Sequence, residues 1–232
     1  MLTLDNTIDL TLEFAALTSI EIVADAARAA LPESLDAVEV RPGVSLASLV
    51  LFQVAPGSHA ELGDFPPYSE LVLAFHVTPA LGRRLPRMAF YVATMGTSLA
   101  RANEFLERVH WINTSPTPIR AEVVDGGRHI RAFDDRGTIV EIVNRHPAPV
   151  FKARQTLGQV FTLRDGKIAF YHELLTGPVH EHQTRHAHIA LSGHPFLAPL
   201  GQTSRTPRVY LQMTSQPGAT ILQAAERPRW LR

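Results

Sequence analysis

The feature that most constrains the fold is the recurrence of short segments in which apolar and polar residues alternate. These segments are rich in β-branched and aromatic residues, and Gly, Pro, Asn or Asp bounds them, which is typical of strands. We therefore expect a mainly β protein with strands over residues 7–14, 19–23, 47–54, 71–77, 89–94, 119–124, 138–144, 159–163, 167–174, 186–191 and 209–214.

Two segments depart from this alternation and predict short helices. Residues 25–31 contain Ala-Ala-Arg-Ala-Ala and end at Pro32, and residues 98–109 place apolar side chains at helical spacing. Turns are expected at 134–137 and 164–167, where Asp and Gly tolerate positive φ between strands, so the sheet should be largely antiparallel. We find no repeat or linker, and expect a single domain over residues 1–232, with a soft division near Pro147.

The composition of the chain limits the classes of molecule that it is expected to bind. The chain has 22 basic and 22 acidic residues, so its formal charge is zero, which disfavours nucleic acid or an anionic membrane as the main partner. No apolar run reaches the roughly 20 residues that span a bilayer, and the first residues do not resemble a secretory signal, so we expect a cytoplasmic protein with a small-molecule ligand. Cysteine is absent, which excludes disulfides and cysteine metal sites.

Four segments, taken in order, resemble the acetoacetate decarboxylase family. Residues 29–35 resemble the short helix that closes in a Leu-Pro turn, and residues 67–73 resemble the Tyr-x-Glu start of a strand. Residues 91–108 resemble a strand followed by the helix that carries an Arg-Glu element, and residues 192–200 resemble the loop near the C-terminus. The resemblance implies an α+β, mainly β fold, an antiparallel β-barrel or double sheet with a few short helices, and a homo-oligomer.

The lysine of that family is missing from its expected place. The family forms a Schiff base through a lysine amine whose pKa is lowered, and this lysine follows a Gly-x-Pro after the Arg-Glu helix. Here the corresponding residues 107–113 contain neither proline nor lysine, and the chain has only Lys152 and Lys167. Lys167 falls in a hairpin turn, where an exposed amine is expected. We therefore predict that no conventional Schiff-base decarboxylase is present, although Lys152 remains a candidate amine.

Glu70 is the first candidate for catalysis. It begins the apolar stretch from Leu71 to Phe75, where desolvation can raise the pKa of a carboxyl group into the range useful for general acid or base catalysis. The resemblance implies that this glutamate lies in a pocket. The alternative is that Glu70 caps the end of a strand or forms an ion pair with an arginine. His76 shares its strand face but lies about 20 Å further along, and a structural role is expected for it.

His110, Trp111 and Asn113 stand where the family's lysine would be. A histidine exchanges protons near neutrality, an indole can line an apolar pocket, and an asparagine can hold a carbonyl or a carboxylate. We predict His110 and Asn113 as catalytic residues beside Glu70, and Trp111 as a substrate-binding residue. The alternative is that Trp111 belongs to the core and that His110 is satisfied at the surface.

The remaining predicted substrate-binding residues come from the segments that carry the resemblance. Arg101 and Glu104 lie one turn apart on the second helix, where they can either face the pocket or form an exposed ion pair. The other three are Tyr68, Tyr91 and His194.

A histidine-rich stretch, residues 180–188, leaves three alternatives open. A continuous strand would place four histidines of this stretch on one face: His180, His182, His186 and His188. Such a face suits a metal site if a neighbouring strand supplies another ligand, such as His172, Glu173 or His194. The alternatives are a histidine-lined substrate pocket and solvated or structurally satisfied histidines. Gly177-Pro178 suggests a turn before His180.

These observations favour a lyase-type enzyme that acts on a small or polyketide-like carbonyl or carboxylate compound. It would be a decarboxylase, dehydratase, isomerase or cyclase that uses general acid/base chemistry without a Schiff base or any cofactor. The alternatives are a non-catalytic binding protein of the same fold and a metal-dependent enzyme built on the histidines. The substrate is not specified by the sequence.

Overall fold

The computed structural model describes residues 7–59, 62–79, 88–110, 112–145, 150–164, 166–215 and 217–224. Strands dominate them, as the alternating segments predicted. The strands are β1 (Thr7–Val23), β2 (Leu35–Ala37), β3 (Glu39–Arg41), β4 (Val44–Val54), β5 (Gly57–His59), β6 (Gly63–Phe65), β7 (Tyr68–Pro79), β8 (Met88–Thr97), β9 (Arg120–Val124), β10 (His129–Asp134), β11 (Gly137–Asn144), β12 (Val150–Arg164), β13 (Lys167–His182), β14 (Ala187–Leu191), β15 (Val209–Ser215) and β16 (Ala219–Ala224).

The helices of the described residues are short. Two α-helices, α1 (Ala24–Ala30) and α2 (Ala100–His110), lie close to the predicted positions, and three 3₁₀ turns are η2 (Asp125–Gly127), η3 (Thr184–His186) and η4 (Pro195–Leu200). Helix α2 buries Ala102, Phe105 and Leu106 and exposes Arg101 and Glu104, as its apolar spacing requires. Within these ranges neither helix has the length and apolar composition needed to cross a bilayer.

One large curved sheet organises the chain. Its order is β15-β1-β16-β13-β12-β8-β7-β4-β3, with β2 paired to β7, and β1 pairs with β4 as well as with β15 and β16. All of these pairings are antiparallel except that of β12 with β8. This parallel pair departs from the antiparallel sheet that the family resemblance implies. Helix α2 and strands β9, β10 and β11 lie between β8 and β12 in the chain, and these three strands belong to another sheet.

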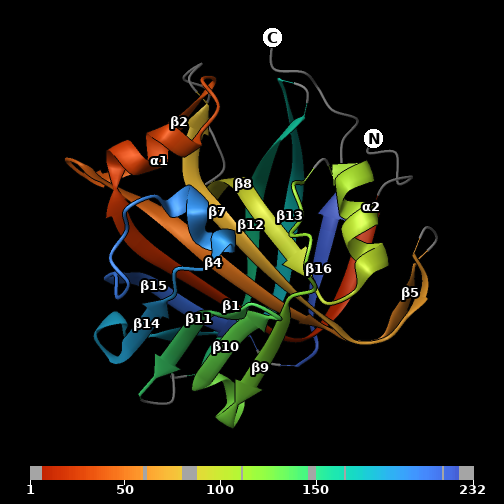
Figure 1. Cartoon of the computed structure of the whole chain (residues 1–232). Coiled ribbons are helices and arrows are strands. Elements are labelled where there is room, and N and C mark those ends of the chain that lie inside the picture. The colour runs from red at the N-terminus through yellow and green to blue at the C-terminus, as the bar shows by residue number, and fades with distance from the viewer. Residues whose placement is uncertain are drawn as a thin grey trace.

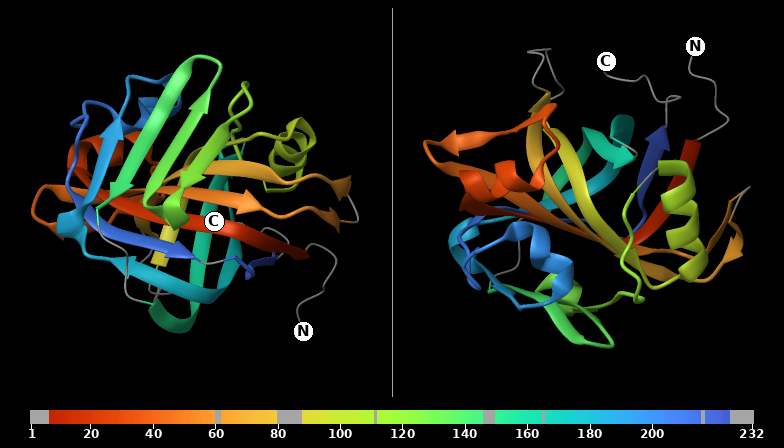
Figure 2. Two further views of the ribbon diagram at one scale, coloured as in Figure 1. Left: turned by 90° about the horizontal axis from the view of Figure 1, so that it is seen from below. Right: turned by 45° about the horizontal axis from the view of Figure 1, so that its top comes forward.

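Smaller sheets complete the architecture. A four-stranded sheet, β14-β11-β10-β9, lies beneath the large sheet in Figure 1 and covers it in the left view of Figure 2. A two-stranded sheet pairs β5 with β6. One hydrophobic core joins the large sheet to the four-stranded sheet, α1 and η4. A second core lies on the other face of the large sheet, against α2.

Several strands differ from their predicted bounds. Residues 7–14 and 19–23 belong to one strand, β1, and β12 and β13 are longer than predicted. The turn expected at Gly177-Pro178 is wrong, because β13 continues through both residues and Gly177 adopts a φ of 152° that glycine allows. Strands β10 and β16 and the three-residue strands β2, β3, β5 and β6 were not predicted.

Candidate functional site

A cavity of about 80 Å³ lies against the second core. Roughly 10–15 Å³ of such volume admits one water molecule, so the cavity has room for a compound of a few non-hydrogen atoms. Its wall comes from the large sheet and α2, and most of it is aliphatic or aromatic. The lining residues are Ala15, Ala16, Leu17, Val50, Phe52, Glu70, Val72, Ala74, Phe90, Val92, Met95, Leu106, Gly158, Val160, Tyr171, Glu173, Leu175, Val179, Met213, Thr214 and Ser215.

Strand alternation explains why Glu70 faces this cavity. On β7, Glu70 and Val72 line the cavity, whereas Leu71 and Leu73 belong to the opposite core. The apolar stretch after Glu70 therefore lies between two cores rather than beside one, and Glu70, directly before it, brings a carboxyl group into an apolar wall.

The Glu70 carboxyl group has an unusual proton affinity. Its side chain is buried, with 4% of the residue exposed, and burial raises its pKa to about 7. A hydrogen bond from Tyr68 opposes this rise, whereas the nearby carboxylate of Glu173 adds to it. Both protonation states are therefore populated near neutral pH, which is the condition for a general acid or base.

Tyr68 holds Glu70 from outside the cavity. Its hydroxyl donates to Glu70, the residue is 6% exposed, and its ring belongs to the second core together with Phe65. Burial raises the pKa of Tyr68, and the charge of Glu70 raises it further. The phenol therefore stays protonated and is the hydrogen-bond donor to Glu70. Tyr68 is not among the residues that line the cavity, and its predicted contact with a substrate stays a prediction.

A second Tyr-x-Glu pair faces Glu70 across the cavity, and sequence reasoning missed its role. Tyr171 and Glu173 on β13 both line the cavity. Burial raises the pKa of Tyr171 well above its ordinary value, and the charges of Glu173 and Glu70 add to the effect. The repetition of Tyr-x-Glu in two strands was the available signal.

Most other predicted site residues lie away from the cavity. Tyr91 points into the opposite core because it has the other parity from Phe90 and Val92. Arg101 and Glu104 are exposed on α2, and Arg101 donates to the main-chain carbonyl of Asp64.

The segment after α2 is only partly described. Asn113 is exposed, its main-chain carbonyl accepts the Met95 N–H at 3.1 Å, and it is not among the residues that line the cavity. Residue Trp111 and the side chain of His110 lie outside the described residues. Their predicted roles stay predictions.

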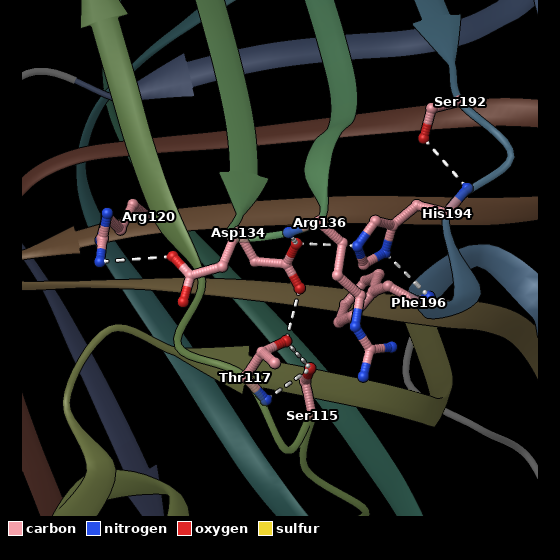
Figure 3. A network of polar contacts seen from close by, with 9 residues as sticks. Ser115, Thr117, Arg120, Asp134, Arg136, Ser192, His194 and Phe196 are labelled. Carbon is pink, nitrogen blue, oxygen red and sulfur yellow. Dashed lines mark hydrogen bonds and ion pairs between the residues drawn. The ribbon is translucent and has the colours of Figure 1, made fainter.

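His194 belongs to a separate buried network (Figure 3). Its Nδ1 accepts the N–H of Phe196 at 3.1 Å, so its Nε2 carries the proton that is donated to Asp134 Oδ1 at 2.9 Å. The other Asp134 oxygen accepts from the Thr117 hydroxyl, and the Arg136 N–H donates to Oδ1 at 2.7 Å. This network joins η4 to the turn between β10 and β11, away from the cavity, and is structural.

The histidine-rich stretch does not form one strand face. Strand β13 ends at His182, η3 intervenes, and β14 begins at Ala187. His182 is buried and its Nε2 lies 3.0 Å from Thr214 Oγ1, whereas His188 is exposed. Among the described residues, no three or more His, Asp or Glu side chains gather in a way that could hold a metal ion.

The two lysines lie in the long β12–β13 hairpin. Lys167 is exposed at the start of β13, as expected for a turn. Lys152 lies in β12, and its side chain is outside the described residues.

Together, the curved mixed sheet, the covering sheet and the internal cavity define an acetoacetate decarboxylase-like fold. No protein-family model and no curated protein sequence matches the chain. Solved structures do match.

An acetoacetate decarboxylase superposes with a TM-score of 0.69 and 12% identity, over 99% of this chain and 91% of that one. An acetoacetate decarboxylase from Legionella pneumophila superposes with a TM-score of 0.65 and 11% identity, over 97% of this chain and 86% of that one. The enduracididine biosynthesis enzyme MppR, complexed with pyruvate, superposes with a TM-score of 0.64 and 14% identity, over 100% of this chain and 92% of that one. The predicted fold is thus confirmed.

Proposed function

We propose that this chain is an enzyme that transfers protons on a small carbonyl or carboxylate compound held in the cavity. Glu70 is the general acid or base, and the reaction belongs to the lyase or isomerase/cyclase class without a Schiff base. The observation that carries the proposal is the buried carboxyl group of Glu70, in the wall of an apolar cavity, with a pKa raised to about 7.

The ligand class has support from size and from structural likeness. A cavity of about 80 Å³ suits the reacting end of a small molecule. MppR, which has this fold, binds pyruvate, a small keto acid. In the proposed step, the Glu70 carboxylate removes a proton from the carbon beside the carbonyl, and the resulting carboxylic acid returns it to the same or another atom of the substrate. Tyr68 orients the carboxyl group from behind.

Deuterium exchange tests this step without knowledge of the net reaction. Pyruvate and a set of small methyl ketones are incubated with the protein in D₂O, and ¹H NMR measures the loss of the protons beside the carbonyl. We expect catalysed exchange for at least one compound, and a loss of roughly 10²–10⁴-fold in Glu70→Gln.

The matched control is Glu33→Gln, which makes the same change at an exposed position in the turn after α1 and should keep the wild-type exchange rate. Exchange by Glu70→Gln at the wild-type rate would remove Glu70 from the mechanism. Binding of the compounds without any catalysed exchange would instead favour the alternative of a non-catalytic binding protein.

A further inference from the structure

A second polar cluster lies on the cavity side of the large sheet, and the proposed reaction does not use it. Ser48 Oγ lies 2.8 Å from Ser19 Oγ and 2.8 Å from His76 Nε2, and Ser19 Oγ lies 3.4 Å from the same nitrogen. We call these three residues the Ser-His cluster. They come from β1, β4 and β7, which are neighbours in the sheet.

Strand parity aligns the Ser-His cluster with the cavity wall. Ser19 is two residues beyond Leu17, and His76 is two residues beyond Ala74, and both of these neighbours line the cavity. Residues two apart on a strand point to the same face, so the cluster continues this wall away from Glu70. Glu70 and His76 are six residues apart on β7, which places their Cα atoms about 20 Å apart.

The cluster presents an uncharged, oriented imidazole. Ser19 and Ser48 are fully buried, whereas His76 is partly exposed. Both hydrogen bonds between the His76 ring and these two residues are at Nε2. The two hydroxyls therefore fix the ring, and Nδ1 remains as its second hydrogen-bonding atom. Burial lowers the pKa of His76 to about 4, so the ring is neutral at physiological pH.

We propose that the Ser-His cluster is a second ligand subsite, opposite Glu70, which takes an uncharged hydrogen-bonding group such as a hydroxyl or a carbonyl. The inference rests on the proposed function, because it assigns the other end of the same ligand to Glu70. The substrate class is then a compound with a reacting carbonyl at one end, an apolar middle and a second neutral polar group at the other end.

Phe90 connects the two ends. Its ring lines the cavity and also meets the His76 ring edge to face, with 4.8 Å between the centroids. The cavity of about 80 Å³ holds only the reacting end of the proposed compound. A ligand that reaches His76 must therefore displace the Phe90 side chain, which is itself only partly buried.

The test is a panel of methyl ketones with alkyl chains of increasing length, each with and without a terminal hydroxyl group. Isothermal titration calorimetry measures the Kd of each compound for the wild type, His76→Phe, Ser48→Ala and Glu70→Gln. At one chain length we expect the hydroxyl to lower the wild-type Kd by roughly tenfold, which is the gain from one well-made neutral hydrogen bond. His76→Phe keeps a ring beside Phe90 and should lose this gain.

Two further variants separate the possible outcomes. Ser48→Ala keeps the imidazole but removes its closest hydroxyl, so the gain should shrink. Glu70→Gln should keep the gain while losing deuterium exchange. As a control, His188→Phe changes an exposed histidine on β14 and should leave every Kd unchanged. Thermal unfolding verifies that each variant is folded.

The subsite is overturned if the hydroxyl strengthens binding at no chain length, or strengthens it equally in His76→Phe. If Glu70-dependent exchange persists in that case, the proposed function survives without the subsite. If the wild type binds no ketone of the panel and catalyses no exchange, the proposed function and the subsite fail together.

Discussion

Replacing Glu70 by glutamine should stabilise the protein, and only at high pH. The ordinary pKa of a glutamate is 4.5, and in the folded protein that of Glu70 is about 7. Each pKa unit corresponds to about 1.4 kcal/mol, so ionised Glu70 costs the folded state about 3 kcal/mol relative to its protonated form. Because the folded-state pKa is the higher one, the contribution of protonated Glu70 to stability is complete below about pH 4.5. It is lost as the pH rises through about 7.

Chemical denaturation of the wild type and Glu70→Gln from pH 4 to pH 9 measures this effect. Glutamine stays neutral, so the difference in the free energy of unfolding should be close to zero at pH 4 and should reach about 3 kcal/mol in favour of the variant at pH 9. Glu104→Gln, on the surface, should show no such divergence. A difference that does not change with pH would refute the raised pKa, and with it the reason for assigning proton transfer to Glu70.

Three other outcomes are expected. Tyr68→Phe removes the hydrogen bond that lowers the pKa of Glu70, so the midpoint of the pH profile of deuterium exchange should rise by roughly one unit; an unchanged midpoint would contradict the contact. Asp134→Ala leaves buried donors unpaired and should cost about 3 kcal/mol by urea denaturation, whereas Asp135→Ala, with a side chain 70% exposed, should cost less than about 0.5. Borohydride treatment with keto acids should leave the mass of the protein unchanged, and an adduct on Lys152 would restore a Schiff base to the mechanism.

The fold was predictable where local alternation decides the structure. The segments around Leu71 and Ile139 alternate between the two faces of a sheet, and both are strands. Strand β11 has nearly the predicted extent, whereas β7 contains the predicted residues 71–77 and continues beyond both ends. Strand β10 was missed because its residues, from His129 to Asp134, include arginine, alanine and aspartate, which have little β-propensity. Strand β10 forms because it pairs with β9 on one side and with β11 on the other.

The site was predictable only in part. The family resemblance implied that Glu70 lies in a pocket, and in the structure Glu70 lines the cavity. Tyr171 lines the cavity because β13 pairs with β12 and β16, and no local sequence pattern specifies these pairings. His194 was predicted from its place in a loop, but whether a loop histidine meets a ligand or a buried aspartate depends on how distant turns pack. Contacts between distant segments are decided by the whole fold.

The pairing of β1 has a consequence for the order in which the chain is made. One edge of this strand pairs with β4, but its other edge pairs with β15 and β16, which end about 200 residues later at Ser215 and Ala224. During synthesis that edge has no native partner until these last strands leave the ribosome. An unpaired strand edge is a template for association with other chains, and sheets closed by such distant segments form slowly. The growing chain therefore carries an unpaired strand edge from the synthesis of β1 until that of β15 and β16, and misassociation at this edge competes with the arrival of those strands.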